Sequence, residues 1–170
     1  MNLLSRNTVP VLLLLACAFS ASAQSAKPGL LTSDEVKKVA PKDYYYRGQS
    51  ATTQLRNTAG IRVTSDGKMV VAGMVDTSGY SSDIAQKYMG FLITEVKLDV
   101  GGSSLAPGQY GFGFTKDGKF VVTDVGANEV CSVSASTDEN LKRPVPLKIT
   151  EDGGAYRLYA GKKWVSLKTE

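Results

Sequence analysis

The sequence predicts a mainly β protein: an antiparallel β-sandwich or a small barrel, with one N-terminal helix and one short crossover helix. Apolar and polar residues alternate with period two from Phe91 to Val100, which is the pattern of a strand because successive side chains leave opposite faces. Asp-Gly dipeptides at Asp66, Asp117 and Asp152 separate apolar runs and are typical of hairpin turns. Helical periodicity is confined to two short stretches, so strands are expected to dominate the fold.

Residues 1–23 are interpreted as a secretory signal peptide. Arg6 precedes an apolar run from Val9 to Phe19, and Ala21-Ser22-Ala23 has the small residues of a cleavage site. The apolar run is shorter than the roughly 20 residues that cross a membrane. As an alternative, Leu14 to Cys17 resembles the lipobox of bacterial lipoproteins, in which Cys17 would be lipidated. The first interpretation predicts a periplasmic or extracellular protein, and the second predicts a protein anchored to the membrane by lipid.

Cleavage after Ala23 leaves enough chain for one domain. Residues 24–29 are predicted to form a short disordered tail and residues 30–168 a single β-rich domain. The formal net charge of the whole chain is +4. A mildly basic domain is soluble and weakly attracted to anionic polymers, but it lacks the dense positive charge of nucleic-acid-binding proteins. We therefore expect no nucleic-acid partner and no transmembrane segment after removal of the signal.

Two short helices are predicted. Thr32 and Glu35 form a capping box that starts a helix from Ser33 to Val39, and Pro41 stops it. A second stretch, Ser81 to Met89, shows a helical stripe and is expected to end at Gly90 as a crossover between a hairpin and the central strand.

Three consecutive tyrosines follow the first helix, and an extended chain would place rings on both of its faces. One interpretation is an edge strand with Tyr45 packed inward and Tyr44 and Tyr46 pointing outward. The other is an aromatic and cationic ligand-binding surface formed by Tyr44, Tyr46 and Arg47. Both interpretations place Tyr44 and Tyr46 on the surface.

Residues 61–75 are predicted to form a hairpin, and its turn has a counterpart later in the chain. Residues 64–71 and 115–122 share the pattern T-x-D-G-K-x-V-V. Internal duplication would explain this repeat, and so would the independent use of a favoured turn. In the second turn, Asp117 and Gly118 are both expected to adopt positive φ.

The central stretch is predicted to continue as one strand from Phe91 to Val100 and then as a hairpin. Within residues 109–114, bulky and small residues alternate, with one face formed by Tyr110, Phe112 and Phe114 and the other by Gly111 and Gly113. A neighbouring ring could cover the flat glycine face, or the strand could bend there. Alternatively, that face could be a groove in which a ligand's backbone or sugar lies.

The C-terminal part is predicted to contain a strand at residues 129–134, a polar excursion at 136–143 and a final hairpin through Gly161. Pro144 and Pro146 argue against a central strand at that point. Aromatic residues of the final hairpin are further candidates for ligand binding by stacking: Tyr156, Tyr159 and Trp164.

The sequence lacks the residues of many common catalytic and metal sites. It contains no histidine, which excludes His-based triads and imidazole ligands. After signal cleavage Cys131 is the one remaining cysteine, so neither an intramolecular disulfide nor a thiolate zinc site is expected. Cys131 is interpreted as a buried small residue or as a reactive thiol. We predict no catalytic residue, no metal and no cofactor, and hence no enzyme.

The phrase Leu105-Ala106-Pro107-Gly108-Gln109-Tyr110, which follows an alternating strand, resembles the L-x-x-G-x-Y turn of uncharacterised exported bacterial β-sandwich proteins. The C-terminal RLYAGKKWV is similar in style to the same group. The resemblance implies a sandwich fold and a location in the cell envelope, and it transfers no catalytic residue.

Three functions follow from these observations as hypotheses. The first is an exported, non-enzymatic binding or scaffold module whose partner is an envelope protein or polysaccharide. The second is a carrier of a small apolar ligand inside a barrel lined by Phe112, Phe114 and Phe120. The third is a hydrolase of envelope polymers, which needs convergent polar groups in one cleft.

Overall fold

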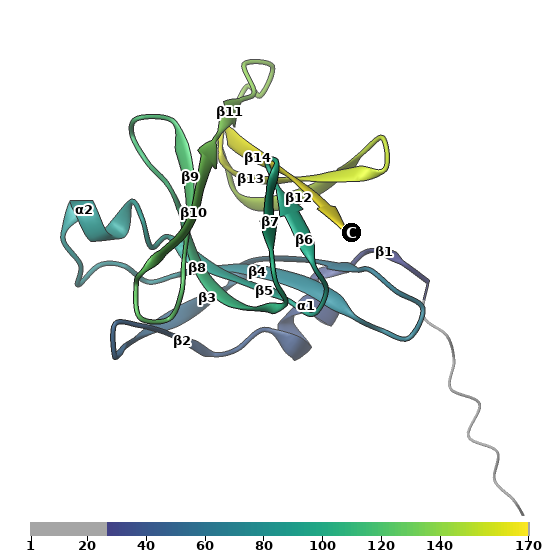
Figure 1. The fold of residues 1–170 in the computed structure, drawn as a ribbon, viewed down its shortest axis with the longest axis horizontal. Coiled ribbons are helices and arrows are strands. Elements are labelled where there is room, and N and C mark those ends of the chain that lie inside the picture. Colours follow the sequence, from purple (N-terminus) through teal and green to yellow (C-terminus); the bar gives the residue numbers. More distant parts are fainter. Residues whose placement is uncertain (1–26, 170) are drawn as a thin grey trace, which may run out of the picture.

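The computed structural model describes residues 27–169 as two antiparallel sheets packed face to face, with two short helices (Figure 1). The first sheet has the strand order β1 (Gly29–Leu30), β3 (Gln49–Arg62), β4 (Met69–Val75), β5 (Gly90–Thr94), β8 (Gly108–Phe114), β9 (Lys119–Thr123) and β10 (Glu129–Ser134), and β2 (Asp43–Tyr46) pairs with β3. The second has the order β12 (Val145–Asp152), β13 (Ala155–Gly161), β14 (Lys163–Thr169), β6 (Leu98–Val100) and β7 (Ser103–Leu105), and β11 (Ser136–Thr137) pairs with β14.

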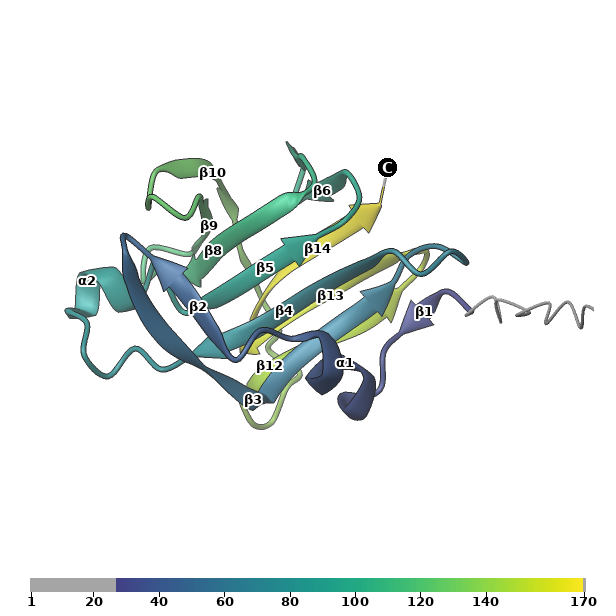
Figure 2. The same cartoon turned by 90° about the horizontal axis from the view of Figure 1, so that it is seen from below.

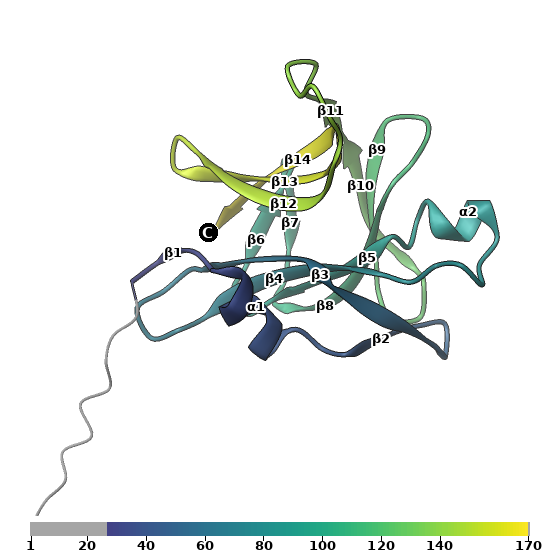
Figure 3. The ribbon, with the colours of Figure 1, turned by 180° about the vertical axis from the view of Figure 1, so that it is seen from behind.

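This arrangement confirms the predicted mainly β sandwich and corrects the alternative of a barrel, because the described strands form two separate sheets. Figure 3 shows β12, β13 and β14 lying over the first sheet. Phe112, Phe114 and Phe120 fill the space between the sheets, with Phe114 and Phe120 ring centroids 4.8 Å apart. Together with Leu92 and Leu158 these rings form the main core. The barrel lumen that the carrier hypothesis required is therefore absent from the described fold.

The prediction of one strand from Phe91 to Val100 is wrong. The chain leaves the first sheet at Thr94 and enters the second at Leu98. At the bend, the hydroxyl of Thr94 donates to the carbonyl of Val96 at 2.6 Å. Leu92, Leu98 and Val100 are nevertheless all completely buried. The alternation is preserved because both halves face the same core from opposite sheets.

Helix α1 (Ser33–Val39) has the predicted capping box. The amide of Thr32 donates to Glu35 Oε2 at 2.8 Å, and the amide of Glu35 donates to Thr32 Oγ1 at 3.3 Å. Figure 2 shows α1 and β2 lying across the outer face of the first sheet. Val36, 1% exposed, packs into that interface, and Arg62 on β3 forms an ion pair with Glu35 at 3.1 Å.

Glu35 makes the stability of this helix dependent on pH. Hydrogen bonds from the amide and then the hydroxyl of Thr32, followed by Arg62, lower the pKa of Glu35 from 4.5 to about 2. A lowered pKa in the folded state stabilises the protein above the ordinary pKa, and this contribution is lost as the pH falls towards 2. Glu35→Gln keeps a capping-box side chain but removes the charge. We expect its melting temperature to lie below that of the wild type at pH 7 and to converge with it near pH 2. A constant difference over that range would contradict this role.

Helix α2 (Ser82–Ala85) is shorter than the predicted Ser81–Met89 segment. Gly90 does not end it, which corrects that prediction, but begins β5. A Cβ atom on Gly90 would lie 2.1 Å from the carbonyl oxygen of Gly73 on the neighbouring strand. Tyr88 lies in the connection between α2 and β5 and is completely buried. The apolar periodicity of Ser81–Met89 therefore indicated residues that become buried, such as Tyr88, but not one continuous helix.

The two T-x-D-G-K turns have the same local construction. In each, a glycine amide donates to the threonine carbonyl three residues earlier: Gly67 to Thr64 at 3.1 Å and Gly118 to Thr115 at 3.2 Å. The threonine hydroxyls also accept the amides of Lys68 and Lys119. Gly118 has a φ of +80°, whereas Asp117 is not among the positive-φ residues, which corrects that expectation. The shared hydrogen bonds give the recurring turn a local physical basis that does not require duplication.

Several predictions about the ends of the chain lie outside the described residues. These are the signal peptide at residues 1–23, lipidation of Cys17 and the first part of the tail, residues 24–26. Strand β1 begins at Gly29, one residue inside the predicted tail, and pairs with β3. Within residues 27–169, no helix has the length and apolar character needed to cross a membrane.

Candidate functional site

The tyrosine run is oriented opposite to the expectation. Tyr44 and Tyr46 are 3% and 5% exposed, whereas Tyr45 is 61% exposed. The prediction that Tyr45 packs inward is therefore wrong, as is the outward placement of Tyr44 and Tyr46. The reason is that β2 does not form a free edge: its hairpin with β3 folds across the outer face of the first sheet, so alternate tyrosines meet that face (Figure 2).

Tyr88 lies at the centre of a second apolar cluster between this hairpin and the sheet. Its ring stacks on Tyr46 with a centroid distance of 4.2 Å, and Tyr80 meets it edge-on at 5.8 Å. The Tyr88 hydroxyl donates to the carbonyl of Tyr44 at 3.1 Å. Tyr44 in turn stacks on Phe91 at 5.4 Å. Tyr44 is thus a buried structural member of this cluster, packed on Tyr88 and Phe91.

The turn between β2 and β3 places Arg47 in an unusual backbone conformation. Tyr46 pairs with Gln49, so Arg47 and Gly48 form a two-residue loop with φ values of +51° and +77°. Two positive φ angles are typical of a type I′ hairpin turn, in which asparagine or glycine is the usual first residue. An arginine there is strained, because its Cβ crowds the backbone. The amide of Arg47 donates to the carbonyl of Val125 at 3.1 Å, which ties the turn to the β9–β10 connection.

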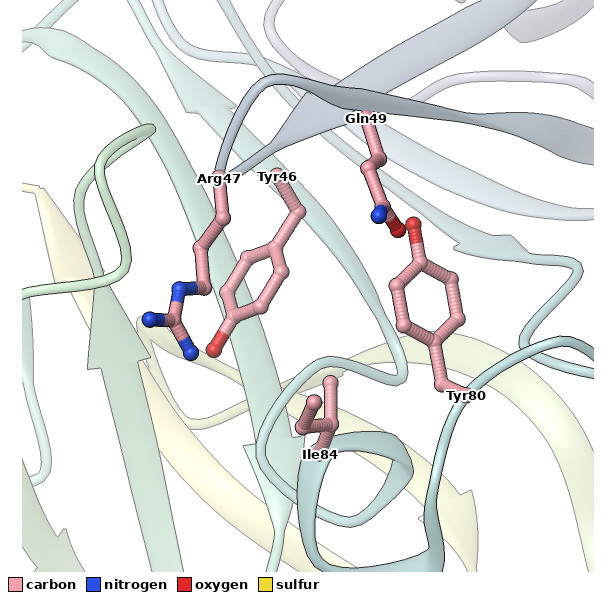
Figure 4. A pocket seen from close by; sticks show the side chains of 5 residues that line it. All are labelled: Tyr46, Arg47, Gln49, Tyr80 and Ile84. Carbon is pink, nitrogen blue, oxygen red and sulfur yellow. The ribbon is translucent and has the colours of Figure 1, made fainter.

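Beside this turn is a pocket of about 180 Å³ lined by Tyr46, Arg47, Gln49, Tyr80 and Ile84. Figure 4 shows the Arg47 and Tyr46 side chains reaching toward Ile84, while the Gln49 side chain points toward the Tyr80 hydroxyl. The pocket therefore combines an apolar floor, two phenol groups, an amide and one cation. Its size suits a single side chain or end group, and its charge suits an anion.

The polar groups that Tyr46 and Arg47 contribute to the pocket act as hydrogen-bond donors. Burial raises the pKa of Tyr46, and the nearby Arg47 offsets part of this increase. The phenol therefore remains protonated at neutral pH and can donate a hydrogen bond. Arg47 contributes further donors in a planar group that matches a carboxylate. None of the five lining residues is an acid or a common nucleophile.

The glycine face of β8 is covered by protein. A Cβ atom on Gly111 would lie 3.2 Å from the ring of Tyr88, and one on Gly113 would lie 2.2 Å from the backbone oxygen of Gln86. The interpretation that a neighbouring ring covers this face is confirmed at Gly111. At Gly113 it is the backbone of the segment after α2 that approaches. The alternative of a ligand groove on this face is contradicted, because no space remains for a ligand.

The second group of predicted binding residues lies on the other sheet and is itself divided. Tyr159 and Trp164 face each other across β13 and β14 on the outward side, with ring centroids 6.3 Å apart. Tyr156 is paired with the buried Leu167 and packs against the main core. The structure thus separates Tyr156 from the two other rings, and separates all three from the Arg47 pocket.

Sequence reasoning missed three residues of this pocket: Gln49, Tyr80 and Ile84. Ile84 lies in the predicted helical segment Ser81–Met89, where its apolar periodicity indicates packing and not a site. Tyr80, in the loop before α2, and Gln49, in a polar run, carry no periodicity that would indicate a site. They meet Arg47 only because the β2–β3 hairpin crosses the sheet and approaches α2.

Asp124 and Cys131 lie outside the Arg47 pocket. Asp124 accepts hydrogen bonds from the amide and the side chain of Asn128, both at 2.9 Å, and these bonds lower its pKa. Cys131 is a free, half-buried residue on β10, and burial raises the pKa of its thiol, which keeps it protonated.

Among the described residues, no group of three or more His, Cys, Asp or Glu side chains is arranged to hold a metal ion. No protein-family model, curated protein or solved structure matches this chain, so its function is inferred from the fold and the geometry described above.

Proposed function

We propose that this chain is an exported, non-enzymatic binding module of the bacterial cell envelope, and that the Arg47 pocket takes a carboxylate group of an envelope protein partner. The signal-like pattern of residues 1–23 supports export. The lining of the pocket supports binding in preference to hydrolysis, because it offers donors and apolar contacts but no acid–base pair.

The observation that carries the proposal is the backbone conformation of Arg47. Residues held at positive φ in spite of a side chain are concentrated at functional sites, where the strain is retained for a purpose. An asparagine would fit this turn better, so stability does not explain an arginine. The direction of its side chain, into a pocket with two phenols and an amide, supplies a purpose (Figure 4).

The chemistry of the pocket suggests the group that it recognises. A guanidinium pairs with a carboxylate through two parallel hydrogen bonds, and Ile84 with the tyrosine rings suits an apolar side chain next to it. Gln49 and Tyr80 are placed to bond a neighbouring amide. A peptide that ends in an apolar residue with a free carboxylate combines these features.

The test is to titrate the isotope-labelled protein with a short peptide that ends in leucine and to follow the Nε–H signal of Arg47 by NMR. We expect this signal to shift with the free carboxylate and not with the amidated peptide. Arg47→Asn should weaken binding about ten-fold or more, since a charged hydrogen-bonded pair is lost. The same substitution should leave the melting temperature unchanged or raise it, because asparagine relieves the strain.

Arg56→Gln provides a matched control, since Arg56 is an exposed arginine elsewhere on β3. It should bind the peptide as the wild type does. If Arg47→Asn destabilised the fold and left binding unaffected, Arg47 would be a structural residue and the proposal would be wrong.

A further inference from the structure

The outward face of β12, β13 and β14 contains a second cluster of aromatic and cationic side chains, on the opposite side of the sandwich from the Arg47 pocket. The strand register places Lys148 beside Tyr159 and Tyr159 beside Trp164. In the next row, Thr150 is beside Arg157 and Arg157 beside Ser166. The inward residues of these strands, such as Leu158 and Val165, are buried in the main core, so the rows face away from it.

Arg157 is held in place on this face by two contacts. Its guanidinium carbon lies 4.2 Å from the centroid of the Trp164 ring, and its NH2 group forms an ion pair with Asp152 at 2.6 Å. Its Nε atom is buried without a hydrogen-bond acceptor among the described residues. The guanidinium is therefore fixed over the indole, which reduces the entropy that a ligand would have to remove.

Tyr159 forms the wall of a shallow hollow beside this pair. Its hydroxyl donates to Asp138 Oδ2 at 3.2 Å, which joins the 138–141 loop to the sheet. The hollow has a volume of about 90 Å³, and its lining combines apolar and polar side chains: Leu141, Val145, Lys148, Thr150 and Tyr159. A flat apolar surface edged by hydroxyls and amines is suited to the mixed CH and OH faces of a sugar ring.

Positive charge is concentrated in this part of the chain. Residues 138–169 contain seven lysines and arginines and four acids: Asp138, Glu139, Glu151 and Asp152. Asp152 is already paired with Arg157. Of the cations, Lys148 is exposed on the outward face, and Lys142 and Arg143 are exposed on the loop that leads into β12. Asp138 accepts the Tyr159 hydroxyl and Asp152 pairs with Arg157, so the exposed Lys142, Arg143 and Lys148 give this face a small excess of positive charge, which favours anions.

We propose that this face binds an acidic polysaccharide, with a sugar ring lying against the half-buried Trp164 and carboxylates pairing with Lys148 and Arg157. Tyr159 is only 6% exposed, so it contributes a wall of the neighbouring hollow and not a stacking surface. Charge complementarity favours an acidic over a neutral sugar chain. The site is independent of the function proposed for the Arg47 pocket.

Trp164 supplies a direct test, because it is the single tryptophan of the chain and Arg157 lies on its ring. We would titrate the protein with an oligomer of galacturonic acid and follow the tryptophan fluorescence. The expected result is a saturable change that a neutral galactose oligomer of the same length does not produce. Raising the ionic strength to about 1 M, where the Debye length is about 3 Å, should weaken it.

Two variants assign the binding to this face. Lys148→Gln combined with Arg157→Gln should raise the Kd for the acidic oligomer at least ten-fold, with circular dichroism confirming the fold. Lys68→Gln, which removes an exposed lysine from the β3–β4 turn, should leave the Kd unchanged. Arg47→Asn should also leave it unchanged, so that failure at one site is distinguishable from failure at the other.

Three results would overturn the proposal: no fluorescence change with the acidic oligomer, equal binding of the neutral oligomer, or equal loss of affinity in Lys68→Gln. Tighter binding of a single-stranded oligonucleotide of the same charge would also overturn it, in favour of a nucleic-acid surface.

Discussion

Replacing Tyr88 by alanine is expected to lower the free energy of unfolding by about 3–5 kcal/mol, the range for removing a large buried ring. Tyr88 is completely buried and contacts the rings of Tyr44, Tyr46 and Tyr80. The substitution would leave a cavity between the β2–β3 hairpin and the first sheet, and it would also remove the hydrogen bond to the carbonyl of Tyr44. Urea denaturation of the purified domain measures the effect.

Two further variants help to interpret this effect: one isolates the hydroxyl of Tyr88, and the other is a control at an exposed tyrosine. Tyr88→Phe keeps the ring and removes only the hydroxyl, so a loss of about 1 kcal/mol is expected. Tyr45→Ala removes a ring that is 61% exposed, and its effect should lie within about 0.5 kcal/mol of zero. If Tyr45→Ala were the more destabilising of the two alanine variants, the orientation of the tyrosine run described above would be wrong.

Tyr88 also connects stability with the Arg47 pocket. Two of the pocket's residues, Tyr46 and Tyr80, rest on its ring. At temperatures where Tyr88→Ala remains folded, we expect it to bind the carboxylate peptide more weakly than the wild type, although Tyr88 does not line the pocket. Tyr88 is thus a positioning residue in the proposed function.

Gly113→Ala is expected to destabilise the protein by about 1–3 kcal/mol, the usual cost of adding atoms to a packed interior. The urea denaturation midpoint measures this effect. The added Cβ would lie 2.2 Å from the Gln86 oxygen and 2.6 Å from the Lys87 carbonyl carbon. Both are backbone atoms, so a side-chain rotation cannot relieve the clash. The segment after α2 would have to move away from β8.

Gly79→Ala is the matched control for this prediction. Gly79 has no positive φ, and no atom lies within 4 Å of the Cβ that the substitution would add. Its denaturation midpoint should equal that of the wild type. Equal midpoints for Gly113→Ala and the wild type would instead mean that the glycine face of β8 is open, as a ligand groove would require.

Features that depend on neighbouring residues were predictable from the sequence. The capping box of α1 needs only Thr32 and Glu35, three positions apart, and it formed as predicted. The hairpin at Gly118 and the edge position of β12, which contains Pro146, follow from the backbone chemistry of glycine and proline. In each case the deciding hydrogen bond, or its absence, lies within a few residues.

The tertiary structure alone decided which face each strand buries and what covers that face. Period two indicates that Tyr44 and Tyr46 share a side, but the β2–β3 hairpin makes that side the inner one by folding over the first sheet. The same holds for residues 90–100, where alternation continues although β5 and β6 lie in different sheets. The Arg47 pocket likewise forms only where this hairpin approaches α2. The physical reason is the same in each case: which side of a strand becomes buried depends on contacts between residues far apart in the chain.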